Sequence, residues 1–331
     1  MAVDYIYKVH SIEYVPLTDP VTPPLSGDPD LTPTVAALTS VSMPVQANVT
    51  REVQAGDIFA TSGRIEFTSV DLSFTTNMAQ KLLQIVGIDG LCMDPLVGHL
   101  NVYVARYECN GPSAGAVHRR YTITKGLFFL QSINTEHQGD ATVSAQIRAV
   151  YEDGGGDPVS VTDNVALPNA TQIGDLSGRW TLHEGTHNSV NGNAVSRKRS
   201  LNIDFGVSTS TQGADSDTFD SFASIDSVLP VVTVQGVDPR WFDTLGLTID
   251  GKAVTHANTS FILRKRDGAG GFIADNVTDA HIRIRANGPA YYDQLLNGNS
   301  TDAATMSFRV EAIQAANGDT PLMIDPLYPT A

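Results

Sequence analysis

The stretch ATVSAQIRAVYEDGGGDP, residues Ala141–Pro158, matches the stretch ATMSFRVEAIQAANGDTP, residues Ala304–Pro321, without a gap. The offset is 163 residues, and both stretches begin with Ala-Thr and end with Pro. Three pairs of apolar positions also match: Val143 with Met306, Ile147 with Val310, and Val150 with Ile313. The pattern therefore predicts that one strand-and-turn unit occurs twice in the chain.

The match extends upstream at slightly different offsets. LLQIVGIDG (Leu82–Gly90) is similar to FDTLGLTIDG (Phe242–Gly251), and LNVYVARYE (Leu100–Glu108) is similar to TSFILRKRD (Thr259–Asp267). The 331 residues thus divide into two units, 1–165 and 166–331. We expect a duplicated domain rather than a short-period repeat.

Within each unit the apolar residues mostly alternate with polar ones, which is typical of half-buried strands. In RIEFTSVDLSF the alternation changes phase at Ser69, so a bulge or strand break is expected there. The other strand candidates lie at 5–15, 100–108, 126–133, 142–151, 201–208, 259–266, 281–286 and 305–313. Asp outnumbers Glu by 28 to 8, which favours turns over helices. The predicted class is all-β, with two tandem β-sandwich or barrel domains.

One short helix is expected in each unit. The first runs from Asn77, as N-cap, to Gly87; the second has Asp238 as cap, Pro239 at the first helical position and Gly246 at its end. The segments Pro16–Thr34 and Ser208–Ser221 are rich in Pro or in small polar residues, and we expect them to form long loops.

Composition excludes several functional classes. The net charge of −15 is spread over both halves, so sequence-specific nucleic-acid binding is not expected. No stretch approaches the roughly 18 apolar residues of a membrane-spanning helix, and no secretory signal is predicted. Cys92 and Cys109 are expected to be buried thiols in a reducing cytoplasm, although a disulfide between them remains open.

His183, Glu184 and His187 have the His-Glu-x-x-His spacing of a zinc protease. That chemistry requires both histidines on one helical face, but residues 185–192 are poor helix formers. In a strand or loop, the two side chains are expected to point in unrelated directions. We therefore predict a polar hairpin here, no catalytic, cofactor or metal-binding residues, no cofactor, and no enzyme activity.

Basic residues cluster at three places: His118–Arg120, Arg197–Arg199 and Arg264–Arg266. A nucleic-acid surface would interleave such residues with aromatic ones. The preferred interpretation is charge on an edge strand that blocks aggregation, or ion pairs between subunits.

The order of these elements resembles the tube domain of phage tail tube proteins. The resemblance rests on Ser40–Asp57 and Arg64–Gly87, and on the closing segment Tyr121–Val159, with a similar order at Ser224–Gly246 and His281–Leu322. Two features depart from the family: the insert at 109–120, which has no partner in the second copy, and the long N-terminal loop.

The resemblance implies a β-sandwich with one flanking helix in each copy. It further implies inner strands that join neighbouring chains into a continuous barrel, and a homotrimeric ring with pseudo-sixfold symmetry. The long loops would contact adjacent rings or other tail and virion proteins, and DNA would pass through the lumen. The protein would then belong to the virion and assemble in the host cytoplasm.

Two other classes remain open beside the metalloenzyme. A major capsid protein with two jelly rolls would have eight strands per copy and no central helix. An extracellular adhesin or carbohydrate-binding pair of sandwiches would expose aromatic residues on a sheet face.

Overall fold

A computed structural model describes residues 5–16, 34–35, 37–55, 58–94, 96–109, 111–151, 157–168, 179–183, 187–214, 217–237, 254–267, 271–298, 304–314 and 320–329. The described chain consists mainly of antiparallel strands with one helix, so the all-β prediction is confirmed. Among the described residues, no helix has both the length and the apolar character needed to cross a membrane.

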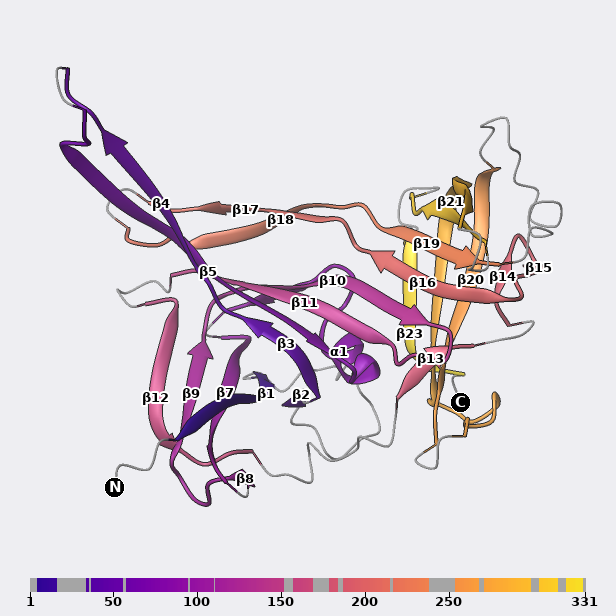
Figure 1. The fold of residues 1–331 in the computed structure, drawn as a ribbon, viewed down its shortest axis with the longest axis horizontal. Coiled ribbons are helices and arrows are strands. Elements are labelled where there is room, and N and C mark those ends of the chain that lie inside the picture. The colour runs from indigo at the N-terminus through magenta and orange to yellow at the C-terminus, as the bar shows by residue number, and fades with distance from the viewer. Residues whose placement is uncertain are drawn as a thin grey trace.

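The first half forms two layers (Figure 1). One layer has the strand order β12 (Val159–Val165), β9 (His118–Ile123), β7 (Gly98–Glu108), β1 (Ile6–Pro16) and β2 (Thr34–Val35), with β8 (Gly111–Pro112) beside β7. The other has the order β10 (Gly126–Glu136), β11 (Thr142–Ala149), β5 (Ser62–Thr76) and β3 (Leu38–Ser42); β6 (Leu91–Met93) pairs with β10 and β4 (Val45–Glu52) with β5. Between them lie buried apolar residues from both layers, including Leu100, Phe74 and Phe128. Helix α1 (Ala79–Ile85) adds Ala79 and Leu82 to this core.

The second half extends the β10 layer. The order continues with β16 (Lys198–Asp204), β19 (Val231–Gly236), β22 (Thr305–Glu311), β21 (His281–Asn297) and β20 (Val254–Lys265). The remaining strands are β13 (Trp180–Leu182) and β14 (Ser189–Val190), which pair with β20, β15 (Asn193–Ala194), which pairs with β14, and β23 (Leu322–Tyr328), which pairs with β21. Strands β17 (Val207–Gln212) and β18 (Phe222–Val228) form a separate hairpin. One cluster of buried apolar residues runs through both halves.

The strand registers of the two halves correspond. Ser40 faces Thr75 in the β3–β5 pair, and Ser200 faces Gln235 in the β16–β19 pair, each residue 160 positions later. Both pairs contain a register shift at the same place, between Leu38 and Ser40 and between Lys198 and Ser200. A β-bulge repeated at one position is a specific feature of a fold.

The pair β12–β9 of the first half corresponds to the pair β23–β21 of the second half. Val159 faces Ile123 in the β12–β9 pair, and Leu322 faces Ala286 in the β23–β21 pair, each 163 positions later. The long strand β21 therefore corresponds to β9 and β10 together. Because β21 is continuous, the two layers of the second half count as parts of one 15-stranded sheet.

A buried histidine repeats with the strands. His118 and His281 are 3% and 1% exposed. In each, Nδ1 accepts a hydrogen bond from a backbone N–H, that of Arg106 or Lys265. These repeated registers and this repeated contact support our inference that the halves 1–165 and 166–331 descend from one module.

Several local expectations are corrected. The bulge near Ser69 is confirmed, because the β4–β5 register shifts between Phe67 and Val70. The N-cap of α1 is Met78 and not Asn77. The segment 109–120 does have a counterpart in part, since Arg119 and Arg120 pair with β7 as Ile282 and Arg283 pair with β20. The expected second helix at Asp238–Gly246 and most of the Pro-rich segment lie outside the described residues.

The segment Ser208–Ser221 was expected to be a loop, and that expectation is wrong for its described part. It forms β17 and the turn toward β18. Cross-strand hydroxyl contacts replace apolar alternation there: Ser208 Oγ lies 2.8 Å from Ser227 Oγ, and Ser210 Oγ lies 3.0 Å from Ser224 Oγ. Such pairs contribute to the stability of the hairpin along its polar face.

Two glycines mark the bend where a strand passes from one layer to the other. A Cβ at Gly126 would overlap the carbonyl oxygen of Arg148, and one at Gly288, 162 positions later, would overlap that of Glu311, 163 positions after Arg148. We expect Gly126→Ala and Gly288→Ala each to lower the free energy of unfolding by about 1–3 kcal/mol. Thermal denaturation measures this effect. Gly87→Ala is the control, because a Cβ there meets nothing within 4 Å; equal melting temperatures for all three variants would contradict the packing described here.

Candidate functional site

The two halves of the chain meet at a junction between edge strands. Strand β10 pairs with β16, with Ile133 facing Ile203 and Asn134 facing Asn202. Both isoleucines are fully buried, and the Asn202 amide donates to Asn134 Oδ1. Strand β10 ends the layer β3-β5-β11-β10 of the first half, and β16 begins the layer β16-β19-β22-β21 of the second half. The junction is therefore a head-to-tail contact between two different edges.

A hairpin arm strengthens this junction. The β17–β18 arm of the second half lies over the first half, where Ile225 and Val207 pack against Leu127, Phe129 and Val150. Arg148 also donates to Thr209 Oγ1 at 2.8 Å. The second half therefore holds the first both by a strand edge and by an arm.

Each strand of this junction has a counterpart in the other half of the chain. In the described residues, neither counterpart has a strand partner on the corresponding side. The counterpart of β16 is β3, whose only pairing in the described residues is with β5. The counterpart of the end of β10 is the end of β21, whose described pairing from Tyr291 to Asn297 is with β22 alone. Leu295 and Leu296, which lie in the register irregularity before Asn297, are 46% and 70% exposed, whereas Ile133, which comes just before the corresponding Asn134, is fully buried.

The first half also carries an uncovered arm. The hairpin β4–β5 projects obliquely to the upper left in Figure 1, whereas β17–β18 runs nearly horizontally, and every described side chain of β4 is exposed. Ile65 is 61% exposed, although its counterpart Ile225 packs on the first half. Ile313, the counterpart of buried Val150, is 43% exposed. Among the described residues, the chain thus presents both partners of its own internal junction without a strand partner at β3 and at the end of β21.

The sheet face opposite the core is polar. Along β5, β11, β16 and β19, residues on this face include Ser73, Thr75, Ser144, Gln146, Ser200, Asn202, Thr233 and Gln235. They bond to one another across strands, as in Thr75–Ser144 at 2.8 Å. Arg148 of β11 is paired with Asp71 at 3.0 Å, and Arg309 of β22 with Asp293 at 3.4 Å. This face therefore offers little unpaired positive charge to a phosphate backbone.

Comparisons with known proteins do not identify the chain. No protein-family model matches it, and no curated protein matches it significantly.

A second feature is a cluster of ionisable side chains at the start of the second half. His183 Nε2 lies 3.0 Å from Asp275 Oδ1, and His187 Nε2 lies 3.5 Å from Asp275 Oδ2. Arg264 Nε lies 3.0 Å from Asp275 Oδ1. Burial opposes ionisation of Asp275, but the hydrogen bond from His183 and the charges of the neighbouring cations lower the pKa of its carboxyl.

The expectation that the two histidines diverge is wrong. Their ring centroids are 5.2 Å apart, although neither residue is helical. The reason is that β13 and β14 both pair with β20, so the chain leaves and rejoins one strand and brings His183 and His187 to the same side. Glu184 lies outside the described residues. The predicted hairpin is confirmed as β14–β15, with Asn191 and Gly192 both at positive φ in its turn.

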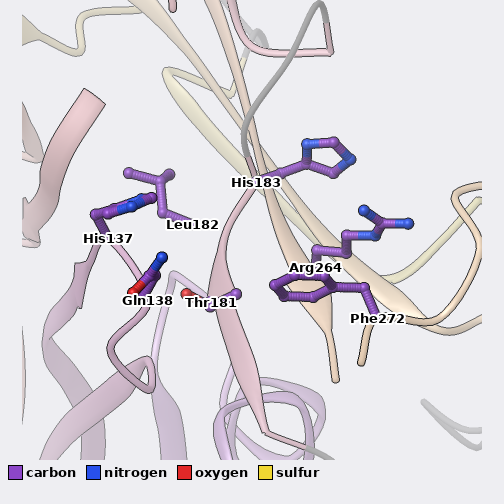
Figure 2. A pocket seen from close by; sticks show the side chains of 7 residues that line it. All are labelled: His137, Gln138, Thr181, Leu182, His183, Arg264 and Phe272. Atoms are coloured by element: carbon purple, nitrogen blue, oxygen red, sulfur yellow. The ribbon is translucent and has the colours of Figure 1, made fainter. Parts of the chain in front are cut away.

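Sequence reasoning did not find Asp275, which follows β20 by ten positions and has no local motif. A small pocket of about 220 Å³ opens beside the cluster. Figure 2 shows His183 and Arg264 projecting to one side of it and His137 lying on the other. This volume is below the range of typical small-molecule sites.

The strands that carry the basic clusters are not edge strands, so the edge-strand alternative is wrong, while ion pairs between subunits stay a prediction. Strands β9, β16 and β20 each have partners on both sides. Their cations form contacts within the chain: Arg119 with Asp163 at 2.7 Å, Arg264 with Asp275 at 3.0 Å, and Lys198 Nζ with the carbonyl of Val195 at 2.5 Å. Cys92 and Cys109 are unpaired, but both are exposed rather than buried.

Two histidines of the first half predict a loss of stability in acid. The pKa of His10 is lowered from 6.5, mainly by burial and further by the nearby His118. The pKa of His99 is lowered by burial and by the charge of Arg120, and the charge of Glu13 opposes this change. The unfolded chain therefore takes up protons near pH 6.5 while the folded chain does not, so stability is complete above that pH and falls as the pH drops through the folded values. We expect the melting temperature to decrease from about pH 7.5 to about pH 5.5, and His99→Gln to reduce the slope. A melting temperature that stays constant over this range would contradict the prediction.

Proposed function

We propose that this protein is a structural subunit of a phage tail tube, which assembles head to tail with copies of itself into rings around a DNA channel. One observation carries the proposal: in the part of the chain that the structure describes, β3 and the end of β21, which correspond to the two sides of the β10–β16 junction, have no strand partner on that side. A contact between unlike surfaces of identical chains closes into a ring when the rotation allows it.

The internal junction supplies the register of the contact between chains. In the internal junction, Ile133 faces Ile203 and Asn134 faces Asn202. If the end of β21 and β3 of the next chain pair in the same way, Leu296 faces Met43 and Asn297 faces Ser42 of that chain. The same transfer places the β4–β5 arm of that chain on the second half of its neighbour, near Ile313. Two exposed apolar patches become buried in a single contact.

The polar sheet face supports the role of a conduit. In a closed ring this face would line the lumen, with hydroxyl and amide groups bonded to one another and arginines paired to carboxylates. DNA would slide along such a surface with little binding. The resemblance to tail tube proteins, in which three duplicated chains form a pseudo-sixfold ring, gives the expected number of copies. Assembly would place the protein in the virion, with other tail proteins as further partners.

The structure gives less support to the capsid alternative. In a jelly roll, consecutive strands alternate between the two sheets. Here β10 and β11 are neighbours in one sheet, as are β7 and β9 in the other, and α1 lies in the core.

Negative-stain electron microscopy of the purified chain tests the proposal. Hollow rings or tubes are the expected result. Closed icosahedral shells would favour the capsid protein instead, and a monomer at all concentrations would contradict self-assembly through these edges.

A further inference from the structure

The cluster around Asp275 has the donor set of a transition-metal site. It brings together Nε2 of His183, Nε2 of His187 and a carboxylate oxygen of Asp275, all within 4.8 Å of one another. Zinc bonds to imidazole nitrogen and carboxylate oxygen are about 2.0–2.2 Å long, so ligand atoms around one ion lie about 3.3 Å apart. The two distances from the histidines to Asp275, 3.0 and 3.5 Å, already fit this spacing.

The groups are held in place by residues that do not donate to the site. Asn188 is fully buried; its amide donates to the carbonyl of His183 at 2.8 Å, and its Oδ1 accepts from the N–H of Ile262 at 2.9 Å. The N–H of His183 in turn donates to the carbonyl of Ile262 at 3.0 Å. His183 is therefore tied to β20 directly and through Asn188, so its ring is oriented before any ion binds.

Arg264 occupies a position suited to the second shell of a metal site. Its Nε contacts Asp275 Oδ1, the oxygen that His183 also contacts, and the carbonyl of Ile273, so Arg264 orients the carboxylate between the two histidines, with Oδ2 facing His187. Ligating carboxylates are commonly oriented by such hydrogen bonds. His183 is 6% exposed and fixed, whereas His187 is exposed and free to close the remaining gap.

We propose that His183, His187 and Asp275 bind one Zn²⁺ ion per chain, with water as the fourth ligand. The donor set of two imidazoles and one carboxylate suits zinc and disfavours Mg²⁺ and Ca²⁺, which require mainly oxygen ligands. The ion joins the segment before β14 to the connection between β20 and β21. The proposal is independent of the tail-tube proposal.

The test is calorimetric titration of the metal-free chain with ZnCl₂, repeated with His187→Ala, Asp275→Asn and the control His137→Ala. His187 is exposed, so its loss leaves the fold intact, while His137 lines the neighbouring pocket without joining the cluster. We expect about one Zn²⁺ per chain, with affinity reduced at least about tenfold in the first two variants and unchanged in the third. A Co²⁺ titration should produce visible absorption bands that disappear in the same two variants. Absence of binding, or equal affinity in all four proteins, would overturn the proposal.

Discussion

Leu296→Glu is expected to abolish ring formation while leaving the chain folded. Leu296 is 70% exposed in the single chain and is expected to be buried against Met43 of the next chain. Loss of one buried leucine weakens each contact by about 1.5–3 kcal/mol, and burial of a carboxylate adds to that. At about 1.4 kcal/mol per factor of ten, each contact weakens at least about tenfold, and a closed ring contains several. Analytical ultracentrifugation measures the assembly, and circular dichroism measures the fold.

Two controls separate an edge effect from a surface effect. Leu96→Glu places the same charge at a leucine that is 78% exposed but lies on neither open edge. Ile133→Glu places it at the equivalent position of the internal junction, where we expect unfolding because Ile133 is fully buried. Rings formed by the Leu296 variant would contradict the proposed register.

Ile65→Glu is the second substitution with a large expected effect. Ile65 on the β4–β5 arm corresponds to Ile225 on the β17–β18 arm, which packs against Phe129 and Val150 of the same chain. We therefore expect Ile65→Glu to prevent or strongly weaken assembly without lowering the melting temperature of the single chain. Ile225→Glu should lower that temperature by about 2–4 °C for each kcal/mol of lost packing. Light scattering and thermal denaturation of both variants measure the contrast, and identical behaviour of the two would argue against equivalent roles for the arms.

The sequence predicted the strands better than the surfaces. Alternating apolar residues in β7, β10, β11 and β22 report burial on one face, and each was found within one to three residues of its expected bounds. The β17–β18 arm was missed because its sequence is rich in serines, which pair across the strands but have the composition of a loop, and because the surface that its few apolar residues cover belongs to the first half.

The histidine cluster was missed for a different reason. The spacing of His183 and His187 was visible, but their common direction follows from the pairing of β13 and β14 with β20. Asp275 lies far along the chain from both, and only the tertiary fold brings it to them. The open edges were equally hidden, since they became recognisable only when the internal junction supplied the pattern for pairing.

Disulfide trapping of the contact between chains tests the central claim most directly. In a chain carrying Cys92→Ser and Cys109→Ser, the further pair Ser42→Cys and Asn297→Cys should form covalent oligomers that end at a closed species, expected to be a trimer. The pair Ser42→Cys and Asp293→Cys, displaced along β21, should form few or none. Only monomers from the first pair, or equal trapping by both, would contradict a ring built by repeating the β10–β16 junction between chains.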